Sequence, residues 1–257
     1  MTTRLFTFGC SFTRWLWPTW SDLLATNFDE FQNYGITGVG NKCIAERVSE
    51  CLLLNDLTSN DTVIVQWTDY HRFDFHRLDL LDHSNWACSG NMHTNPHLPT
   101  EISSLWSEYS YIMHTWNFIN FTANLLKNSK CQWYFTSSVD IASDLEDFPT
   151  LSRYKKILEL ENWLPNIDSV VDRNTYQGIK MPKGWFNSKT QIQDTHPTTA
   201  HYRLWLAKYL QPITKYQDYD TVFDRIQNEK LEYSDIDWST LNIKNSWDQF
   251  KNYKIGL

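Results

Sequence analysis

The stretch that decides the fold is LFTFGCSFT, residues 5–13. A short apolar run that stops at a glycine is typical of a buried strand, and such a strand presents Ser11 just beyond its end. Near the other end of the sequence lies DTHP, residues 194–197, where His196 follows Asp194 and precedes a predicted helix. A serine hydroxyl is a weak nucleophile without an adjacent base, so the two stretches predict a catalytic pair of Ser11 and His196. Asp194 is the candidate acid that orients the imidazole.

Outward from these stretches, the chain alternates between strand and helix patterns. Residues 61–68 (DTVIVQWT) are a nearly continuous apolar run, which is typical of a strand buried on both faces. Asn41 and Thr198 are good N-caps for the helical patterns that follow them. The alternation predicts a mostly parallel sheet with helices on both faces, a three-layer α/β/α domain of flavodoxin-like type. The expected strands are 4–9, 31–34, 61–68 and 130–137, and the expected helices are 18–28, 41–55, 105–126, 152–162 and 198–210.

We expect residues 1–210 to form one α/β domain, because 257 residues are enough for one full core and an appendage. Residues 70–103 are rich in His, Asn, Asp, Ser and Pro, and this composition predicts a long irregular loop inserted in that domain. Residues 211–257 are polar and aromatic, and their pattern predicts an extension without assigning its architecture.

The composition argues against several classes of partner. A net charge of −7 without a basic cluster disfavours nucleic acid. Five widely spaced cysteines, an odd number, favour a reduced compartment over a disulfide framework. No leader pattern and no apolar run of membrane-spanning length occurs, so the sequence predicts a soluble cytoplasmic protein without a membrane partner. The 13 Trp, 13 Tyr and 14 Phe suit sugar stacking as well as a core of bulky residues.

Candidate site residues converge at the predicted strand ends. In sheets of this kind, ligands lie outside the carboxyl ends of the strands. Ser11, the glycine-rich loop at residues 35–40 and the pair Thr68–Asp69 all follow such ends. An acyl-transfer intermediate needs preorganised donors for its oxyanion. The backbone N–H groups of Ser11 and Gly38 are the candidates.

Four stretches resemble, in order, the four sequence blocks of the SGNH (GDSL-type) hydrolase family, which contribute Ser, Gly, Asn and His. They are GCSF at 9–12, NYGITG at 33–38, the strand end at 63–69 and DTHP at 194–197. The resemblance implies that residues 1–210 form an SGNH-hydrolase-like domain. It also implies that Ser11 is the nucleophile and Gly38 the glycine of the oxyanion hole.

Two departures from the family pattern concern the site. The third block, normally Gly-x-Asn-Asp, is QWTD at residues 66–69. The resemblance therefore implies the Thr68 hydroxyl as a third oxyanion donor in place of the usual asparagine. In the last block the family separates Asp and His by two residues, whereas Asp194 lies only two positions before His196 and Gln193 occupies the usual acid position.

Further candidates surround the third block. Trp67, Asp69 and Arg72 are candidate substrate-binding residues, with Trp67 as a pocket wall and Arg72 placed to reach a substrate anion or a loop carbonyl. The five histidines within 70–103 lack the tight spacing of a zinc motif. We therefore expect neither a metal nor a cofactor.

These observations predict a serine ester hydrolase that acts through an acyl-enzyme. The family resemblance and the aromatic content favour short-chain acyl esters, such as O-acetylated carbohydrate, so the expected partner is a small-molecule or glycan ester. Two alternatives stay open. One is a binding or structural protein that keeps the fold with an eroded site, which the changes at Thr68 and Gln193 favour. The other is an O-acyltransferase that uses the same residues.

Overall fold

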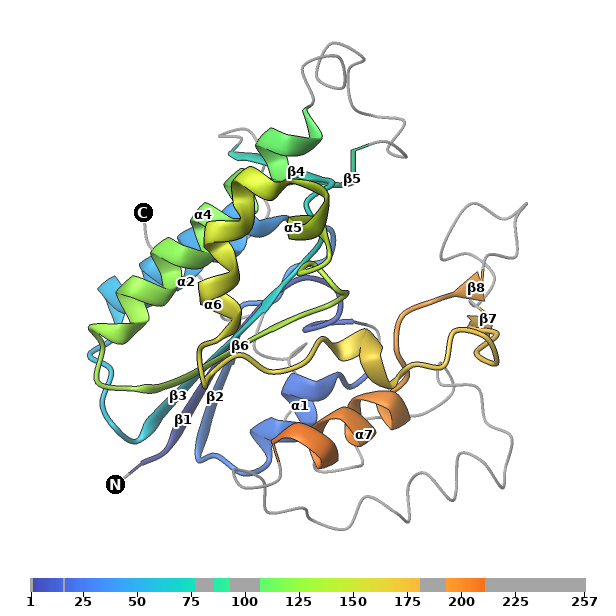
Figure 1. The fold of residues 1–257 in the computed structure, drawn as a ribbon. Coiled ribbons are helices and arrows are strands. Elements are labelled where there is room, and N and C mark those ends of the chain that lie inside the picture. Colours follow the sequence, from blue (N-terminus) through green and yellow to red (C-terminus); the bar gives the residue numbers. More distant parts are fainter. Residues whose placement is uncertain (1, 16, 77–85, 93–106, 181–192, 211–257) are drawn as a thin grey trace.

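A computed structural model describes residues 2–15, 17–76, 86–92, 107–180 and 193–210 (Figure 1). Its main sheet contains strands β1 (Arg4–Phe8), β2 (Glu30–Asn33), β3 (Asp61–Trp67) and β6 (Gln132–Ser137). The strand order is β2-β1-β3-β6, and every neighbouring pair is parallel. The predicted parallel sheet is therefore confirmed, and its order follows the flavodoxin-like pattern.

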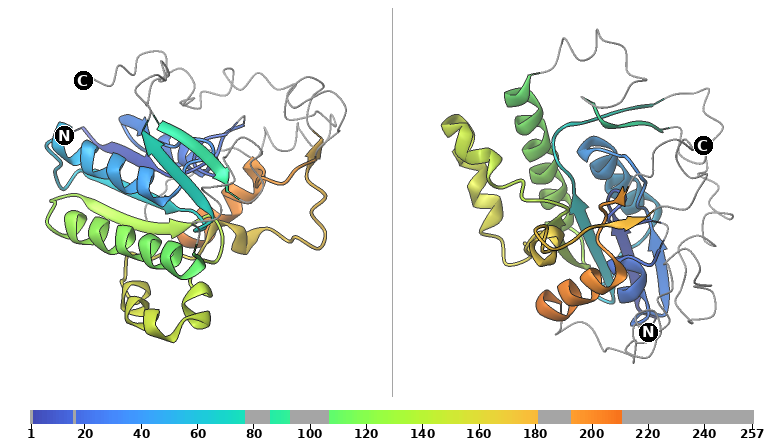
Figure 2. Two further views of the ribbon diagram at one scale, coloured as in Figure 1. Left: turned by 90° about the horizontal axis from the view of Figure 1, so that it is seen from above. Right: turned by 90° about the vertical axis from the view of Figure 1, so that its right-hand side faces the viewer.

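Helices cover both faces of this sheet (Figures 1 and 2). Helices α2 (Asn41–Leu54) and α4 (Glu108–Lys127) pack together on one face, and α1 (Trp20–Ala25) packs with α7 (Thr199–Tyr209) on the other. This arrangement confirms the three-layer architecture. Within the described residues, no helix is both long and apolar enough to cross a membrane.

The core takes up much of the aromatic content. Every residue of β3 is buried, as expected for a central parallel strand. Among the described residues, four tryptophans are wholly buried: Trp20, Trp67, Trp116 and Trp205. Trp67 packs edge-on against Phe135, with ring centroids 5.4 Å apart. Packing in the core, rather than contact with a ligand, therefore accounts for these four tryptophans.

The expectation of an irregular loop at 70–103 is wrong for part of that segment. Strand β4 (Arg72–His76) pairs antiparallel with β5 (Trp86–Asn91), and the register shifts between Arg72 and Asp74. Asp74 is buried and accepts hydrogen bonds from the N–H groups of Gly40 and Cys43 at the start of α2. The polar residue that indicated a loop thus satisfies a helix end, a tertiary role that composition does not show. Residues 77–85 and 93–103 lie outside the described part.

Other boundaries differ locally. The N-cap of α2 is Gly40, and Asn41 is instead the first helical residue. The Asn41 side chain is used elsewhere: it donates to the Thr68 carbonyl and accepts from the Thr68 N–H. Thr198 is confirmed as the N-cap of α7.

The segment after β6 consists of short elements rather than the single helix expected at 152–162. A 3-10 helix, η1 (Pro149–Tyr154), leads into the one-turn helix α6 (Lys155–Leu158). The other short elements are α5 (Asp144–Asp147), η2 (Ile167–Val170), and strands β7 (Ile179–Lys180) and β8 (Gln193–Asp194), which pair antiparallel. The extension predicted at 211–257 lies outside the described residues.

Candidate active site

A tight turn at the end of β1 presents Ser11. The N–H groups of Thr13 and Arg14 both donate to the Cys10 carbonyl, at 2.9 and 3.2 Å. Gly9 precedes the turn with φ of 157°, and a Cβ there would lie 2.1 Å from the Thr13 hydroxyl oxygen. A side chain at position 9 would therefore displace the turn, which explains the glycine that ends the strand.

Gln66 supports the nucleophile turn from the neighbouring strand β3. Its Oε1 accepts from the Cys10 N–H at 3.2 Å and from the Thr13 hydroxyl at 3.0 Å. The side chain is wholly buried at the position where the resembling family has glycine. Sequence reasoning missed this residue, since only the departure from the family glycine marked it.

The structure brings Ser11, His196 and Asp194 into one hydrogen-bonded relay. Ser11 Oγ lies 2.7 Å from His196 Nε2, and His196 Nδ1 lies 2.6 Å from Asp194 Oδ1. An ionised carboxylate can only accept, so the proton of a neutral imidazole sits on Nδ1. The Nε2 lone pair then faces the Ser11 hydroxyl, which is the arrangement that general-base activation of a serine requires.

The short spacing between Asp194 and His196 is compatible with this relay. Asp194 Oδ1 also accepts from the backbone N–H of His196 at 2.8 Å, so one oxygen holds both the backbone and the ring of the same residue. Burial alone would raise the pKa of the Asp194 carboxyl, but hydrogen bonds and charge from His196, with a hydrogen bond from Trp15, lower it below its usual value. The relay therefore keeps Asp194 ionised.

Aromatic side chains of the nucleophile loop contact the histidine loop. The Trp15 ring stacks on the His196 ring with centroids 3.9 Å apart and an interplanar angle of 18°, and its Nε1 donates to Asp194 Oδ2 at 2.8 Å. Phe12 lies against the same imidazole at 5.4 Å. Trp17 Nε1 donates to the Pro197 carbonyl at 2.9 Å. The sequence offered no signal for these contacts beyond the closely spaced tryptophans.

The two N–H groups expected to hold an oxyanion are those of Ser11 and Gly38. Within the described residues, neither Ser11 nor Gly38 donates a hydrogen bond from its N–H. Gly38 has φ of 82°, a conformation that favours glycine, and its carbonyl accepts from the Gly90 N–H of β5 at 3.1 Å. The hairpin thus helps to hold the loop that carries Gly38.

Thr68 is the residue that the resemblance implied as a third oxyanion donor. The residue is wholly buried, and its hydroxyl has no hydrogen-bond partner among the described residues. A buried hydroxyl offers no donor to a substrate oxygen in this conformation, so the structure does not support Thr68 as a third oxyanion donor. Its peptide groups are held by Asn41 at 2.9 and 2.8 Å.

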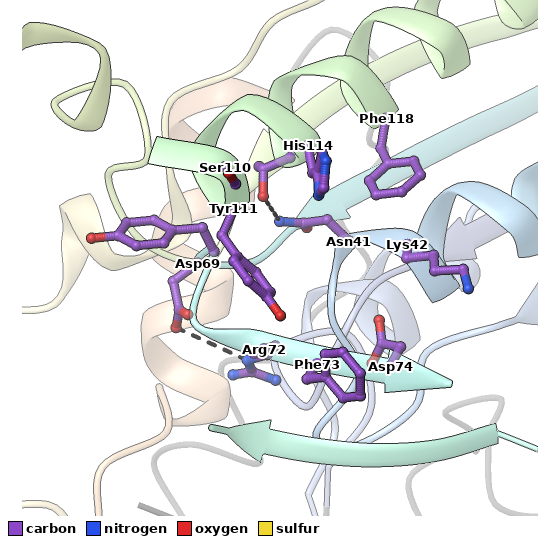
Figure 3. A pocket seen from close by; sticks show the side chains of 12 residues that line it. Asn41, Lys42, Asp69, Arg72, Phe73, Asp74, Ser110, Tyr111, His114 and Phe118 are labelled. Carbon is purple, nitrogen blue, oxygen red and sulfur yellow. Dashed lines mark hydrogen bonds and ion pairs between the residues drawn. The ribbon is translucent and has the colours of Figure 1, made fainter. Parts of the chain in front are cut away.

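A cavity of about 550 Å³ lies between the start of α2, the strand β4 and the helix α4 (Figure 3). Asp69 and Arg72, two of the expected substrate-binding residues, line it, whereas Trp67 is in the core and cannot be a pocket wall. Ser11 and His196 are not among its lining residues. Its other lining residues include Asn41, Lys42, Tyr70, Phe73, Asp74, Ser110, Tyr111, His114, Thr115 and Phe118.

Hydrogen bonds from two lining residues, Arg72 and Asn41, connect this cavity to the loops of the candidate site. Arg72 Nη1 donates to the carbonyl of Val39, the residue after Gly38, at 3.1 Å. Asn41 binds the backbone of Thr68, as described above. The cavity therefore adjoins the carboxyl ends of β2 and β3, although it does not contain the relay.

Among the described residues, no group of three or more His, Cys, Asp or Glu side chains is placed to hold a metal ion. His71 lies near Asp69, with Nδ1 and Oδ1 3.5 Å apart. The histidines at 83, 93 and 97 lie outside the described part.

No family model matches the chain, and no curated protein matches it. It is similar to a solved member of the lipolytic protein G-D-S-L family from Veillonella parvula: 14% identity, 83% of this chain and 100% of that chain, TM-score 0.48. A GDSL-like lipase from Bacteroides thetaiotaomicron matches at 15% identity over 82% of this chain and 87% of that chain, TM-score 0.43. TesA matches at 11% identity over 82% of this chain and 100% of that chain, with a TM-score of 0.44. Two of these solved structures carry the name of the GDSL family, whose sequence blocks the four stretches of this chain resemble. At TM-scores below 0.5 the likenesses leave function to be argued from the site.

Proposed function

We propose that this protein is a serine hydrolase that cleaves esters through an acyl-enzyme. The observation that carries the proposal is the relay from Ser11 through His196 to Asp194, with contacts of 2.7 and 2.6 Å. Three residues from two chain segments 185 positions apart meet at hydrogen-bonding distance with the roles of nucleophile, base and orienting acid. The intact relay favours a hydrolase over a binding protein with an eroded site.

The mechanism follows from the positions of the protons. His196 Nε2 removes the Ser11 proton as Oγ attacks the ester carbonyl, and the oxyanion is held by the N–H groups of Ser11 and Gly38. The imidazolium then protonates the leaving alcohol, and the carbonyl re-forms as an ester of Ser11. Water, deprotonated by the same nitrogen, attacks this ester and releases the carboxylic acid and free Ser11.

The adjoining cavity favours a polar alcohol portion such as a carbohydrate. Its lining combines the rings of Phe73, Tyr111 and Phe118 with the charged groups of Asp69 and Arg72 (Figure 3). Aromatic faces stack on sugar rings, and paired polar groups fix hydroxyls, as in most small-molecule sites. We propose a short acyl chain on such an alcohol as the substrate.

A fluorophosphonate probe tests the nucleophile. We expect the folded protein to label at Ser11 and to hydrolyse aryl acetates, and we expect Ser11→Ala to do neither. Ser152→Ala, a change at an exposed serine, is the matched control and should label like the wild type. A folded wild-type protein that neither labels nor turns over aryl acetate would overturn the proposal and favour a binding protein with the same fold.

The acyl-enzyme can also transfer its acyl group to an alcohol, which is the acyltransferase alternative. Product analysis with and without an added sugar acceptor separates the two. Free acid as the main product in both cases supports hydrolysis, and acylated sugar as the main product supports transfer.

A further inference from the structure

We propose that Trp15 is a positioning residue of this site, which fixes the Asp194 carboxylate by a hydrogen bond and the His196 imidazole by stacking. The inference rests on the proposed function and adds a member to its machinery. Trp15 lies four positions after the nucleophile and on the same loop. One side chain thus contacts both His196 and Asp194 from the segment that carries Ser11.

The carboxylate has one oxygen that the histidine leaves free. Asp194 Oδ1 accepts from both the backbone N–H and Nδ1 of His196, at 2.8 and 2.6 Å. Asp194 is only 6% exposed, so water cannot easily serve the other oxygen. Among the described residues, the donor to Oδ2 is Trp15 Nε1, at 2.8 Å. With both oxygens held, the carboxylate cannot rotate about its bond to Cβ, and Oδ1 stays directed at Nδ1.

The indole also limits the imidazole ring. The two rings lie nearly parallel, at 18° with centroids 3.9 Å apart, so the His196 ring cannot swing toward Trp15 without a clash. When His196 takes the serine proton, it becomes a cation over an aromatic face, an arrangement that stabilises the charge. The contact therefore acts on the geometry before the reaction and on the charge that forms during it.

This role explains how the short spacing in the last block works. An acid two positions before the histidine is restricted by the chain between them, and its Oδ1 is drawn to the His196 backbone as well as to the ring. A second anchor from outside the segment holds the carboxylate in the plane that both bonds need. Trp15 supplies it from a segment 179 positions away.

Trp17 provides a matched comparison. It lies on the same loop, and its Nε1 also donates to the histidine loop, at 2.9 Å, but the acceptor is the Pro197 carbonyl. A general loss of loop-to-loop contact would affect variants of both tryptophans alike. Loss of carboxylate and imidazole positioning would affect Trp15 alone.

The test compares Trp15→Phe, Trp15→Leu and Trp17→Phe in aryl acetate hydrolysis, with folding checked by circular dichroism. Trp15→Phe keeps a stacking ring and loses the N–H, and we expect kcat to fall about 10-fold with KM within about 2-fold. Trp15→Leu loses both contacts, and we expect a fall of about 100-fold. For Trp17→Phe we expect kcat within about 3-fold of wild type.

A second readout does not depend on turnover. The proton between His196 Nδ1 and Asp194 should give a low-field NMR resonance, assigned by its loss in His196→Gln. We expect it to move upfield and broaden in Trp15→Phe and to persist in Trp17→Phe. An unchanged resonance with unchanged kcat in both Trp15 variants would overturn the inference, as would equal losses in the Trp15 and Trp17 variants.

The two proposals can fail separately. A wild-type protein that does not label at Ser11 overturns the ester hydrolase but leaves the NMR comparison to decide on Trp15. If the wild-type enzyme is active but neither the resonance nor kcat changes in the Trp15 variants, the proposed function stands and only the role of Trp15 is overturned.

Discussion

Asp194 and Asp74 are two buried carboxyl groups, the first beside His196 and the second at the start of α2, and their pKa values shift in opposite directions. Asp194 accepts from the backbone and ring of His196 and from Trp15. Asp74 accepts from the backbone N–H groups of Gly40 and Cys43. The pKa of Asp194 is lowered, whereas burial raises the pKa of Asp74 despite its hydrogen bonds. At Asp74 burial outweighs the backbone hydrogen bonds and the charges of Arg72 and Lys42, whereas at Asp194 the hydrogen bonds and charge of His196, with the Trp15 hydrogen bond, outweigh burial.

The comparison separates a reactive side of the site from a structural side. Around His196, buried polar groups are arranged along the path by which the Ser11 proton would be transferred. On the hairpin side, Asp74 holds the start of α2, Asn41 holds the Thr68 backbone, and the cavity forms between them. Four changes test this division.

The largest effect is expected at Asp194. In Asp194→Asn an amide replaces the carboxylate. If its NH₂ faces Nδ1, the imidazole proton moves to Nε2, and Nε2 can then no longer accept the proton of Ser11. We expect kcat for aryl acetate to fall about 10⁴-fold, with fluorophosphonate labelling slowed in parallel. A decrease in kcat of less than about 10-fold in a folded variant would show that Asp194 contributes little to catalysis and would remove the contrast with Asp74.

Asp74→Ala should act on stability. The change leaves the N–H groups of Gly40 and Cys43 without their buried acceptor, and we expect the free energy of unfolding to drop by about 2–3 kcal/mol in urea denaturation. Asp56→Ala, at an exposed aspartate, is the control and should change it by less than about 0.5 kcal/mol. Equal values for the two variants would contradict the structural role of Asp74.

Asp144, on the hairpin side of the sheet, gives a prediction in pH. Burial, followed by repulsion from Asp140 and Asp69, raises the pKa of Asp144 to about 7. A raised carboxyl pKa favours the protonated form in the folded state, so its stabilisation is complete below the ordinary pKa near 4 and is lost as the pH rises to about 7.

We expect Asp144→Asn to reduce the change in the free energy of unfolding between pH 4 and 8 by about 2 kcal/mol. This is less than the full pKa shift corresponds to, because the side chain is partly exposed and solvent screens its charge. Urea denaturation across this range measures it. Asp74 has the same sign, so some dependence should persist in the variant. An identical slope in wild type and variant would show that Asp144 titrates normally.

The smallest effect is expected at Thr68. Thr68→Val keeps the shape and removes a buried hydroxyl without a partner among the described residues. We expect kcat within about 3-fold and an unfolding temperature equal to or above that of the wild type, because the hydroxyl is desolvated without compensation. A loss of about 10²-fold in kcat, measured with aryl acetate, would restore Thr68 to the oxyanion hole.

The main sheet and its helices could be predicted because their signals are local. The apolar run at 61–68 specifies a strand buried on both faces, and Thr198 ends up as the cap that its sequence position indicates. Ser11, His196 and Asp194 were found as candidates since a strand end and a helix start mark them. Gly38 was reached in the same way, from the glycine-rich loop after a strand.

What could not be predicted depends on contacts between distant segments. The antiparallel hairpin of β4 and β5 was hidden because Asp74 reads as a loop residue until α2 is placed beside it. Trp15 reads as one aromatic among many until Asp194 lies 2.8 Å away. The burial of the Thr68 hydroxyl could not be predicted, because the family pattern specifies a position in the chain but not which way its side chain turns.

The contact between Ser11 and His196 closes a loop of 185 residues, and this separation orders the assembly of the site in time. The strand that delivers the serine is the first in the chain, but the base arrives with the last described helix. The chain must close this loop before the contact can form. A chain in which the two segments have not docked holds a serine without a base, so the gain of reactivity toward a fluorophosphonate would report their docking.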